Sequence, residues 1–231
     1  MWLKITYSPT SLFSLKSSSA TNSAGKSLLI PSPYSVKMAL LNAIITYDSL
    51  DTAKANFSLI RDLEIRFSLP TSLTVSNCLI RILKDNDKVS KAVKLEKPFK
   101  TTVAFREYVY LNDNIEIAID LNAEKTILPE EIEFLKKWFI HINYFGKKGC
   151  FFQFISADVV EELEESKFCT IISDGFKPGV FMKMDDVDKK ANFESMNNYN
   201  SKKKAKRINT IYTFPVSIKK TSKTYSFYER I

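Results

Sequence analysis

The chain has 231 residues, 45% of them hydrophobic, and a formal net charge of +8. That length allows one large domain or a domain with a sizeable extension, and that composition allows a buried core. We expect no membrane-spanning helix, because the sequence has no run of eighteen apolar residues. We expect no secretory signal, because "MWLKITYSPT" lacks a basic segment followed by an apolar one. The three cysteines are scattered and form no CxxC motif, which favours reduced thiols in the cytoplasm and no structural zinc.

The first predicted strand is the alternating segment "MWLKITYS", and the Ser-rich residues 9–27 after it read as a loop. A helix is predicted to begin at Pro33, because Ser32 suits the capping position and proline suits the first helical position. Apolar residues then recur at helical spacing as far as Tyr47. A second, short helix is expected over about 52–65.

Residues 72–83, "SLTVSNCLIRIL", are predicted to form a strand, and the lysine-rich segment 84–100 interrupts the pattern. Strands resume at 102–110 and 114–121, on either side of an Asn-Asp-Asn turn. An amphipathic helix, "LPEEIEFLKKWFIHINYF", is expected to end at Gly146, and "CFFQFI" reads as one more strand.

Apart from the interrupting segment 84–100, this element order is the βαββαβ order of a ferredoxin-like domain. We assign this α+β fold to residues 1–155. Residues 156–231 are expected to be β-rich, with an acidic helix at 158–166 and a mobile basic loop near 186–207. Strand-like runs occur at 167–173, 179–184, 208–218 and 223–229.

The strand predicted at 102–110 has two chemically different faces, because side chains alternate along a strand. Arg106, Tyr108 and Tyr110 share one face, and this combination suits RNA, since tyrosines stack on bases and arginine pairs with phosphates. An ordinary exposed or half-buried sheet face is the alternative. Glu107 falls on the other face, among apolar residues.

The basic excess is concentrated at the end of the chain, where residues 171–231 carry thirteen bases and six acids. Such asymmetry suggests a polyanionic partner, with nucleic acid as the first choice. The lysines of 84–100 and the run "KKKAKR" at 202–207 could neutralise phosphates, or they are simply solvated.

His141 is the only histidine, which excludes a two-histidine nuclease and a multi-histidine metal site. Lys137 and Tyr144 are its neighbours at helical spacing, so a metal-independent RNA-cleaving cluster is one interpretation and a histidine at the edge of the core is the other. The segment "SAGKS" lacks the first glycine of a P-loop.

Three segments resemble, in order, the motifs of the CRISPR-associated (Cas) family five. They are "IPSPYSVKMALLNAI", "FREYVYLNDNIEIAIDL" and "YFGKKGCFFQF", and together they span about residues 28–155. The resemblance implies a small RNA-binding subunit of the type I CRISPR surveillance complex, Cascade, with a ferredoxin-like domain and an inserted β-hairpin thumb. Carried across, 84–110 would be the thumb and 114–121 the third core strand. Arg106, Tyr108 and Tyr110 would then line the returning arm of the thumb and face RNA or a partner subunit. Glu107 would be placed to pair with a basic residue nearby, such as Arg81 on the strand leading out.

The resemblance also implies the partners. The subunit would bind and cap the 5′ handle of the CRISPR RNA, bridge the backbone and large subunits, and lie near target DNA within the complex, away from any membrane. Family members that cut RNA use a tyrosine, a lysine and a histidine, whereas here no histidine adjoins the thumb or the first helix. We therefore expect a binding subunit without catalytic residues, metal or cofactor. The alternatives are a metal-independent endoribonuclease and a purely structural subunit.

Twelve residues are expected to contact RNA, some in the segments that carry the resemblance and some in the N-terminal residues before them. They are Lys4, Tyr7, Lys16, Lys26, Ser32, Tyr34, Lys37, Lys94, Lys100, Arg106, Tyr108 and Tyr110.

Overall fold

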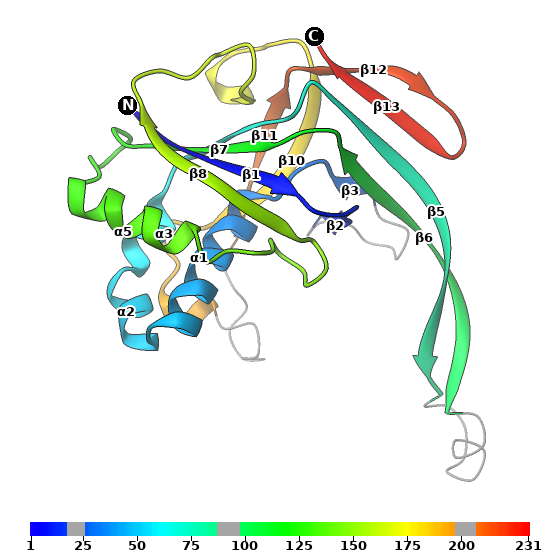
Figure 1. Ribbon diagram of the computed structural model, residues 1–231, viewed down its shortest axis with the longest axis horizontal. Coiled ribbons are helices and arrows are strands. Elements are labelled where there is room, and N and C mark those ends of the chain that lie inside the picture. The colour runs from blue at the N-terminus through cyan, green and yellow to red at the C-terminus, as the bar shows by residue number, and fades with distance from the viewer. Residues whose placement is uncertain (18–25, 87–97, 197–206) are drawn as a thin grey trace.

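The computed structural model describes residues 1–17, 26–86, 98–196 and 207–231. It is a mixed α/β structure built mostly from antiparallel sheets (Figure 1). The central sheet has the strand order β4-β7-β1-β8, and each neighbouring pair is antiparallel. Its strands are β1 (Trp2–Pro9), β4 (Ile65–Ser68), β7 (Ile115–Asp120) and β8 (Phe152–Val160).

Helices gather on one side of the central sheet (Figure 1). They are α1 (Pro33–Tyr47), α2 (Leu50–Ala55), α3 (Phe57–Asp62) and α5 (Pro129–Phe139). Alternate residues of β1, among them Leu3 and Ile5, are buried, because apolar side chains of one strand face are covered while the other face stays partly open. The predicted start of α1 is confirmed, since the Ser32 side chain accepts a hydrogen bond from the Ser35 amide.

Three predicted helices differ from the structure. The helix expected over 52–65 is two short helices, and Ile65 already belongs to β4, where pairing with β7 gives its backbone a strand ladder. The helix expected to reach Gly146 ends at Phe139 and continues as turns, with the His141 amide bonded to the Trp138 carbonyl. No helix forms at 158–166, because β8 extends to Val160 along β1 and puts the acidic residues at its exposed end.

A second sheet carries a long hairpin that projects from the body, and its strand order is β12-β13-β5-β6 (Figure 1). The hairpin arms pair from Leu73 with Leu111 to Asp85 with Phe99. The strand predicted over 72–83 is therefore one arm of this hairpin, and the range 84–110 expected for the thumb holds only part of it. The strands are β5 (Ser72–Asp85), β6 (Phe99–Leu111), β12 (Val216–Thr221) and β13 (Tyr225–Arg230).

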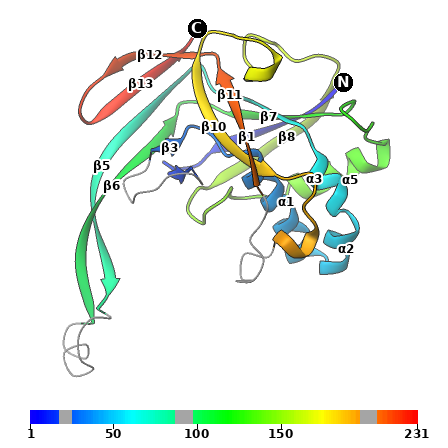
Figure 2. The same cartoon turned by 180° about the vertical axis from the view of Figure 1, so that it is seen from behind.

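A third sheet, in the order β10-β11-β9, has β10 against α1 (Figure 2). Its strands are β9 (Thr170–Ile171), β10 (Val180–Val187) and β11 (Arg207–Phe214), and β2 (Leu15–Lys16) pairs with β3 (Ser27–Leu28) in a small fourth sheet. Two 3-10 turns, Ile172–Asp174 and Phe193–Met196, complete the structure.

The mobile loop predicted near 186–207 lies partly outside the described residues, which stop at 196 and resume at 207. The described part is packed: Met196 is buried and the Phe193 ring meets Phe57 edge-on. Within the part of the chain that the structure describes, no helix is long and apolar enough to cross a membrane.

Candidate nucleic-acid interface

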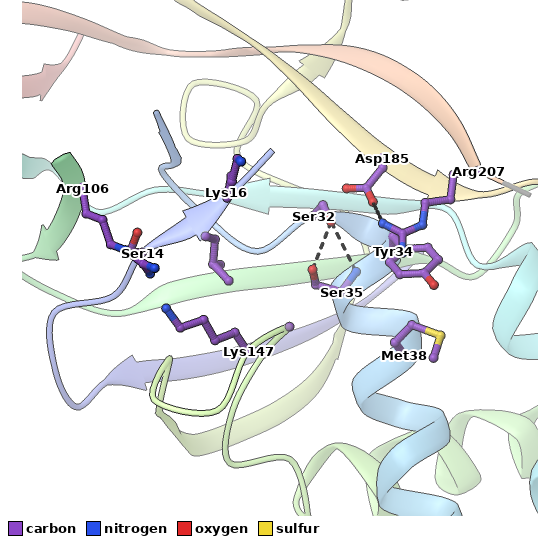
Figure 3. Close-up of a pocket in the computed structure, with 12 residues that line it drawn as sticks. Ser14, Lys16, Ser32, Tyr34, Ser35, Met38, Arg106, Lys147, Asp185 and Arg207 are labelled. Carbon is purple, nitrogen blue, oxygen red and sulfur yellow. Dashed lines mark hydrogen bonds and ion pairs between the residues drawn. The ribbon is translucent and has the colours of Figure 1, made fainter. Parts of the chain in front are cut away.

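A pocket of about 360 Å³ lies where the N-terminal loop, the start of α1, β6, β10 and β11 meet (Figure 3). Four of its lining side chains are basic, Lys16, Arg106, Lys147 and Arg207, and one is acidic, Asp185. The pocket therefore combines an excess of positive charge with room for a small anionic group. The other lining residues are Ser14, Leu15, Ser32, Tyr34, Ser35, Met38 and Gly146.

The pocket unites four of the residues predicted to bind RNA, namely Lys16, Ser32, Tyr34 and Arg106. They come from separate parts of the chain, which the fold brings together. Ser32 caps α1, so the pocket also borders a helix N-terminus, whose dipole favours anions.

Arg207 is held in place by two contacts. Its guanidinium carbon lies 3.8 Å from the centroid of the Tyr34 ring, and its Nη1 donates to Asp185 Oδ2 at 2.8 Å (Figure 3). Tyr34 and Asp185 are both buried, whereas the Arg207 side chain remains about a third exposed. The guanidinium plane is thus preorganised at the pocket, and it covers the Tyr34 ring face that would otherwise be offered to a base.

Arg106 is positioned by the contacts that fasten β6 to the N-terminal loop. Phe13 pairs through its backbone with Val109, and Glu107 Oε2 accepts from the Ser27 amide at 2.7 Å. The predicted Glu107–Arg81 pair is wrong, because Glu107 lies opposite Asn77 in the hairpin register and Arg81 lies four residues farther toward the tip. Glu107 therefore anchors β3 and leaves Arg106 at the pocket mouth.

Two of the predicted RNA contacts lie in the core instead. Lys37 is 2% exposed, and its Nζ donates to Asp186 Oδ2 at 2.9 Å and to the Arg61 carbonyl at 2.8 Å. Burial lowers the pKa of Lys37, and the neighbouring Asp186 carboxylate opposes that shift. Tyr7 is fully buried and donates its hydroxyl to the Phe139 carbonyl at 2.6 Å, so its ring is not accessible to a base.

The remaining predicted contacts lie outside the pocket. Lys4 pairs with Glu116 at 3.0 Å across the central sheet, and Lys26 is exposed beside β3. Lys100 lies opposite Lys84 near the end of the described hairpin. Tyr108 is half-buried and Tyr110 exposed on β6, whereas Lys94 lies outside the described residues.

Lys147 and Arg207 were missed as site residues. Lys147 belongs to the segment "YFGKKGC" that carries the family resemblance, and Arg207 ends the basic run "KKKAKR", so both had a sequence signal. What the sequence could not indicate is their neighbourhood, because Arg207 meets Tyr34 across more than 170 positions of the chain.

His141 does not form the cluster that helical spacing suggested. Since α5 ends at Phe139, Tyr144 is not on a helix face with it. The His141 ring instead stacks on Tyr47, with centroids 4.8 Å apart, and Lys137 Nζ lies 4.6 Å from the Trp138 ring centroid. Tyr47 is the last residue of α1, so the expectation that no histidine adjoins the first helix is wrong. Among the described residues, no three His, Cys, Asp or Glu side chains come together as a metal-binding group.

Comparison with known proteins finds a CRISPR-associated protein Cas5 from Archaeoglobus fulgidus. It is 26% identical to this chain over 208 residues, which cover 87% of this chain and 86% of the relative. The resemblance to Cas family five is confirmed. No family model matches the chain.

Among solved structures, a CRISPR protein from Archaeoglobus fulgidus has a TM-score of 0.52 and 13% identity, covering 100% of this chain and 92% of that chain. This likeness indicates a shared fold. A CRISPR RNA-guided surveillance complex contains a chain with a TM-score of 0.44 and 12% identity, covering 92% of this chain and 88% of that one, a level at which the likeness carries no weight.

Proposed function

We propose that this protein is an RNA-binding subunit of a type I CRISPR surveillance complex, in which the basic pocket holds the 5′ handle of the CRISPR RNA. The observation that carries the proposal is the convergence of Lys16, Arg106, Lys147 and Arg207 on one pocket, in a chain similar to Cas5 over most of its length. Cationic side chains around a small cavity suit phosphate groups, and the single carboxylate there is already paired with Arg207.

The scaffold of this site is a ferredoxin-like domain with an inserted thumb. In support, the strand order β8-β1-β7-β4 is the 4-1-3-2 order in which βαββαβ units arrange an antiparallel sheet, and helices follow β1 and β7. The hairpin of β5 and β6 lies between β4 and β7, the second and third strands of that order, and so the thumb is the range 72–111.

Within the pocket, the division of roles follows from side-chain chemistry. Lys16, Arg106 and Lys147 would neutralise phosphates, because each of these lining side chains carries a positive charge. Arg207 would stack its free guanidinium face on a base, since arginine planes serve as stacking surfaces in single-stranded RNA recognition and the other face is occupied by Tyr34.

The hairpin offers a second, different surface for the partner subunits. Five of its odd-numbered side chains are large, apolar and exposed, and a sheet face of this kind favours association. We assign this face to the neighbouring backbone subunit, with the large subunit and target DNA contacted elsewhere on the chain. The residues are Leu79, Leu83, Phe99, Val103 and Phe105.

The subunit would bind RNA without cutting it. In support, His141 stacks on Tyr47 and does not line the basic pocket, so an RNA held there would lie apart from the one imidazole of the chain. Processing of the precursor RNA would then fall to a separate nuclease.

The test uses the full chain and a labelled RNA copy of the repeat from its own CRISPR array. The variant Arg106→Gln/Lys147→Gln should weaken binding, and the log–log salt slope should fall by about 0.7 for each phosphate that is no longer neutralised. The matched control Lys136→Gln/Lys137→Gln removes the same charge from α5, outside the pocket. Equal weakening by both variants would mean that RNA binds to a diffuse basic surface and not to the pocket. Shortening of the RNA by the wild-type chain would refute the non-catalytic role.

A further inference from the structure

The outward face of the β12-β13-β5-β6 sheet carries four aromatic side chains on two strands. Tyr108 and Tyr110 lie on β6, and Tyr225 and Phe227 lie on β13. The pairing register aligns them in two rows, since Thr74 of β5 lies opposite both Tyr110 and Phe227, and Ser76 opposite both Tyr108 and Tyr225. We call these four aromatic residues the aromatic platform.

The register also establishes that the platform faces away from the core. Leu73 and Val75, at the odd positions of β5, are buried, so the even positions point to the other face of the sheet. Tyr110 is 54% exposed and Tyr225 37% exposed, even though aromatic side chains are usually well covered. The aromatic residues on β6 and those on β13 are about 10 Å apart, because β5, with small side chains there, lies between the two strands.

Positive charge borders the platform on two sides. Lys220 lies opposite Phe227 on β12 and is exposed, and Arg106 lies two residues before Tyr108 on the same face of β6. Arg106 also lines the basic pocket, so the pocket and the strand face that carries the platform share this residue. Glu229 is the one carboxylate on this face of the paired strands β5, β6, β12 and β13, opposite Ser72.

From these observations we propose that the aromatic platform stacks the bases of the single-stranded RNA that leaves the basic pocket, with Lys220 on its phosphates. The inference rests on the proposed RNA-binding function and adds residues of β12 and β13 to it. Aromatic side chains on a sheet stack successive bases with little regard to sequence. A protein partner fits less well, because the most exposed apolar side chains of the hairpin, among them Leu79 and Leu83, lie on its opposite face.

The experiment measures fluorescence anisotropy of a labelled single-stranded RNA of about twenty nucleotides that begins with the 5′ handle. The variant Tyr225→Leu/Phe227→Leu keeps apolar bulk but removes both rings, and it should weaken binding on the order of tenfold with an unchanged salt slope. Lys220→Gln should instead lower the slope by about 0.7. The matched control Leu79→Ala/Phe105→Ala changes the opposite face of the hairpin and should bind RNA like the wild type.

The outcomes separate this inference from the proposed function. If the wild type binds and the Arg106→Gln/Lys147→Gln variant weakens binding while the ring variants stay within about twofold, the platform inference is overturned and the pocket stands. If the wild type does not bind RNA, both are overturned. Should the double ring variant fail to fold, Tyr110→Ala changes the most exposed ring alone and should weaken binding about fivefold. Ring variants that still bind RNA like the wild type but no longer bind a partner subunit would also overturn the inference.

Discussion

Removing one member of the buried Lys37–Asp186 ion pair should strongly destabilise the protein. Lys37 is 2% exposed and its Nζ lies 2.8 Å from Asp186 Oδ1. Among the described residues, the ammonium group would keep only the Arg61 carbonyl as a hydrogen-bond partner in Asp186→Ala. An uncompensated buried charge costs about 3–5 kcal/mol. We expect about 3 kcal/mol here, because the Asp186 side chain is 19% exposed and water can reach the site.

Urea unfolding followed by far-ultraviolet circular dichroism gives the free energy of unfolding for each variant. The loss should lower the melting temperature by about 6–12 °C, since 1 kcal/mol corresponds to roughly 2–4 °C in a chain of this size. Lys37→Met removes the buried charge itself. The double variant Lys37→Met/Asp186→Ala should therefore lose about 2 kcal/mol less unfolding free energy than the two single variants lose in sum.

The exposed pair Glu133–Lys136 on α5 is the control. Its atoms are 2.7 Å apart, close to the Lys37–Asp186 distance, but the Glu133 side chain is 71% exposed. Glu133→Ala should cost less than about 0.5 kcal/mol. If the losses at Lys37 and Asp186 simply add, or if Asp186→Ala costs no more than Glu133→Ala, then burial does not strengthen this pair and the reasoning fails.

Three further predictions concern separate parts of the chain. A thiol reagent at about pH 8 should modify Cys78 but not Cys169 in the folded protein, because burial raises the pKa of Cys169 to about 12 whereas Cys78 is half-exposed; rapid loss of both thiols would contradict this. His141→Ala should leave guide maturation in a reconstituted system unchanged, and loss of mature guide with an intact fold would overturn the non-catalytic role. Gly179→Ala should cost about 2–3 kcal/mol in urea unfolding, since φ is 152° and a Cβ would lie 2.0 Å from the Phe214 carbonyl oxygen; a stable variant would show that β10 and β11 can separate there.

Local signals in the sequence were sufficient for the elements whose patterns are short-range. The start of α1 follows from Ser32 and Pro33 alone, and the alternation of the hairpin arms follows from their side-chain periodicity. Strand β4 was missed because it has four residues and follows α3 after only two, without a turn signal to separate it from the helix. Its strand geometry comes from pairing with β7, about fifty positions away.

The same limit applies to the site. Lys37 looks like any lysine near a helix start, and its burial depends on Asp186, a partner 149 positions away. Arg207 and Tyr34 are likewise joined only by the packing of β11 beside the first turn of α1. Of the four cations at the pocket, the sequence therefore indicated Lys16 and Arg106 and missed Lys147 and Arg207. Only the tertiary structure separates these accessible cations from the buried Lys37.

The Lys37–Asp186 pair also connects stability to the proposed function. Asp186 is adjacent in β10 to Asp185, the carboxylate that holds Arg207 over Tyr34. Neighbouring strand residues point to opposite faces. Asp186 therefore binds the buried Lys37 of α1, whereas Asp185 orients the pocket arginine Arg207. A shift of β10 away from α1 would thus move Arg207 as well, so the buried ion pair positions a basic group that the sequence places on a different strand.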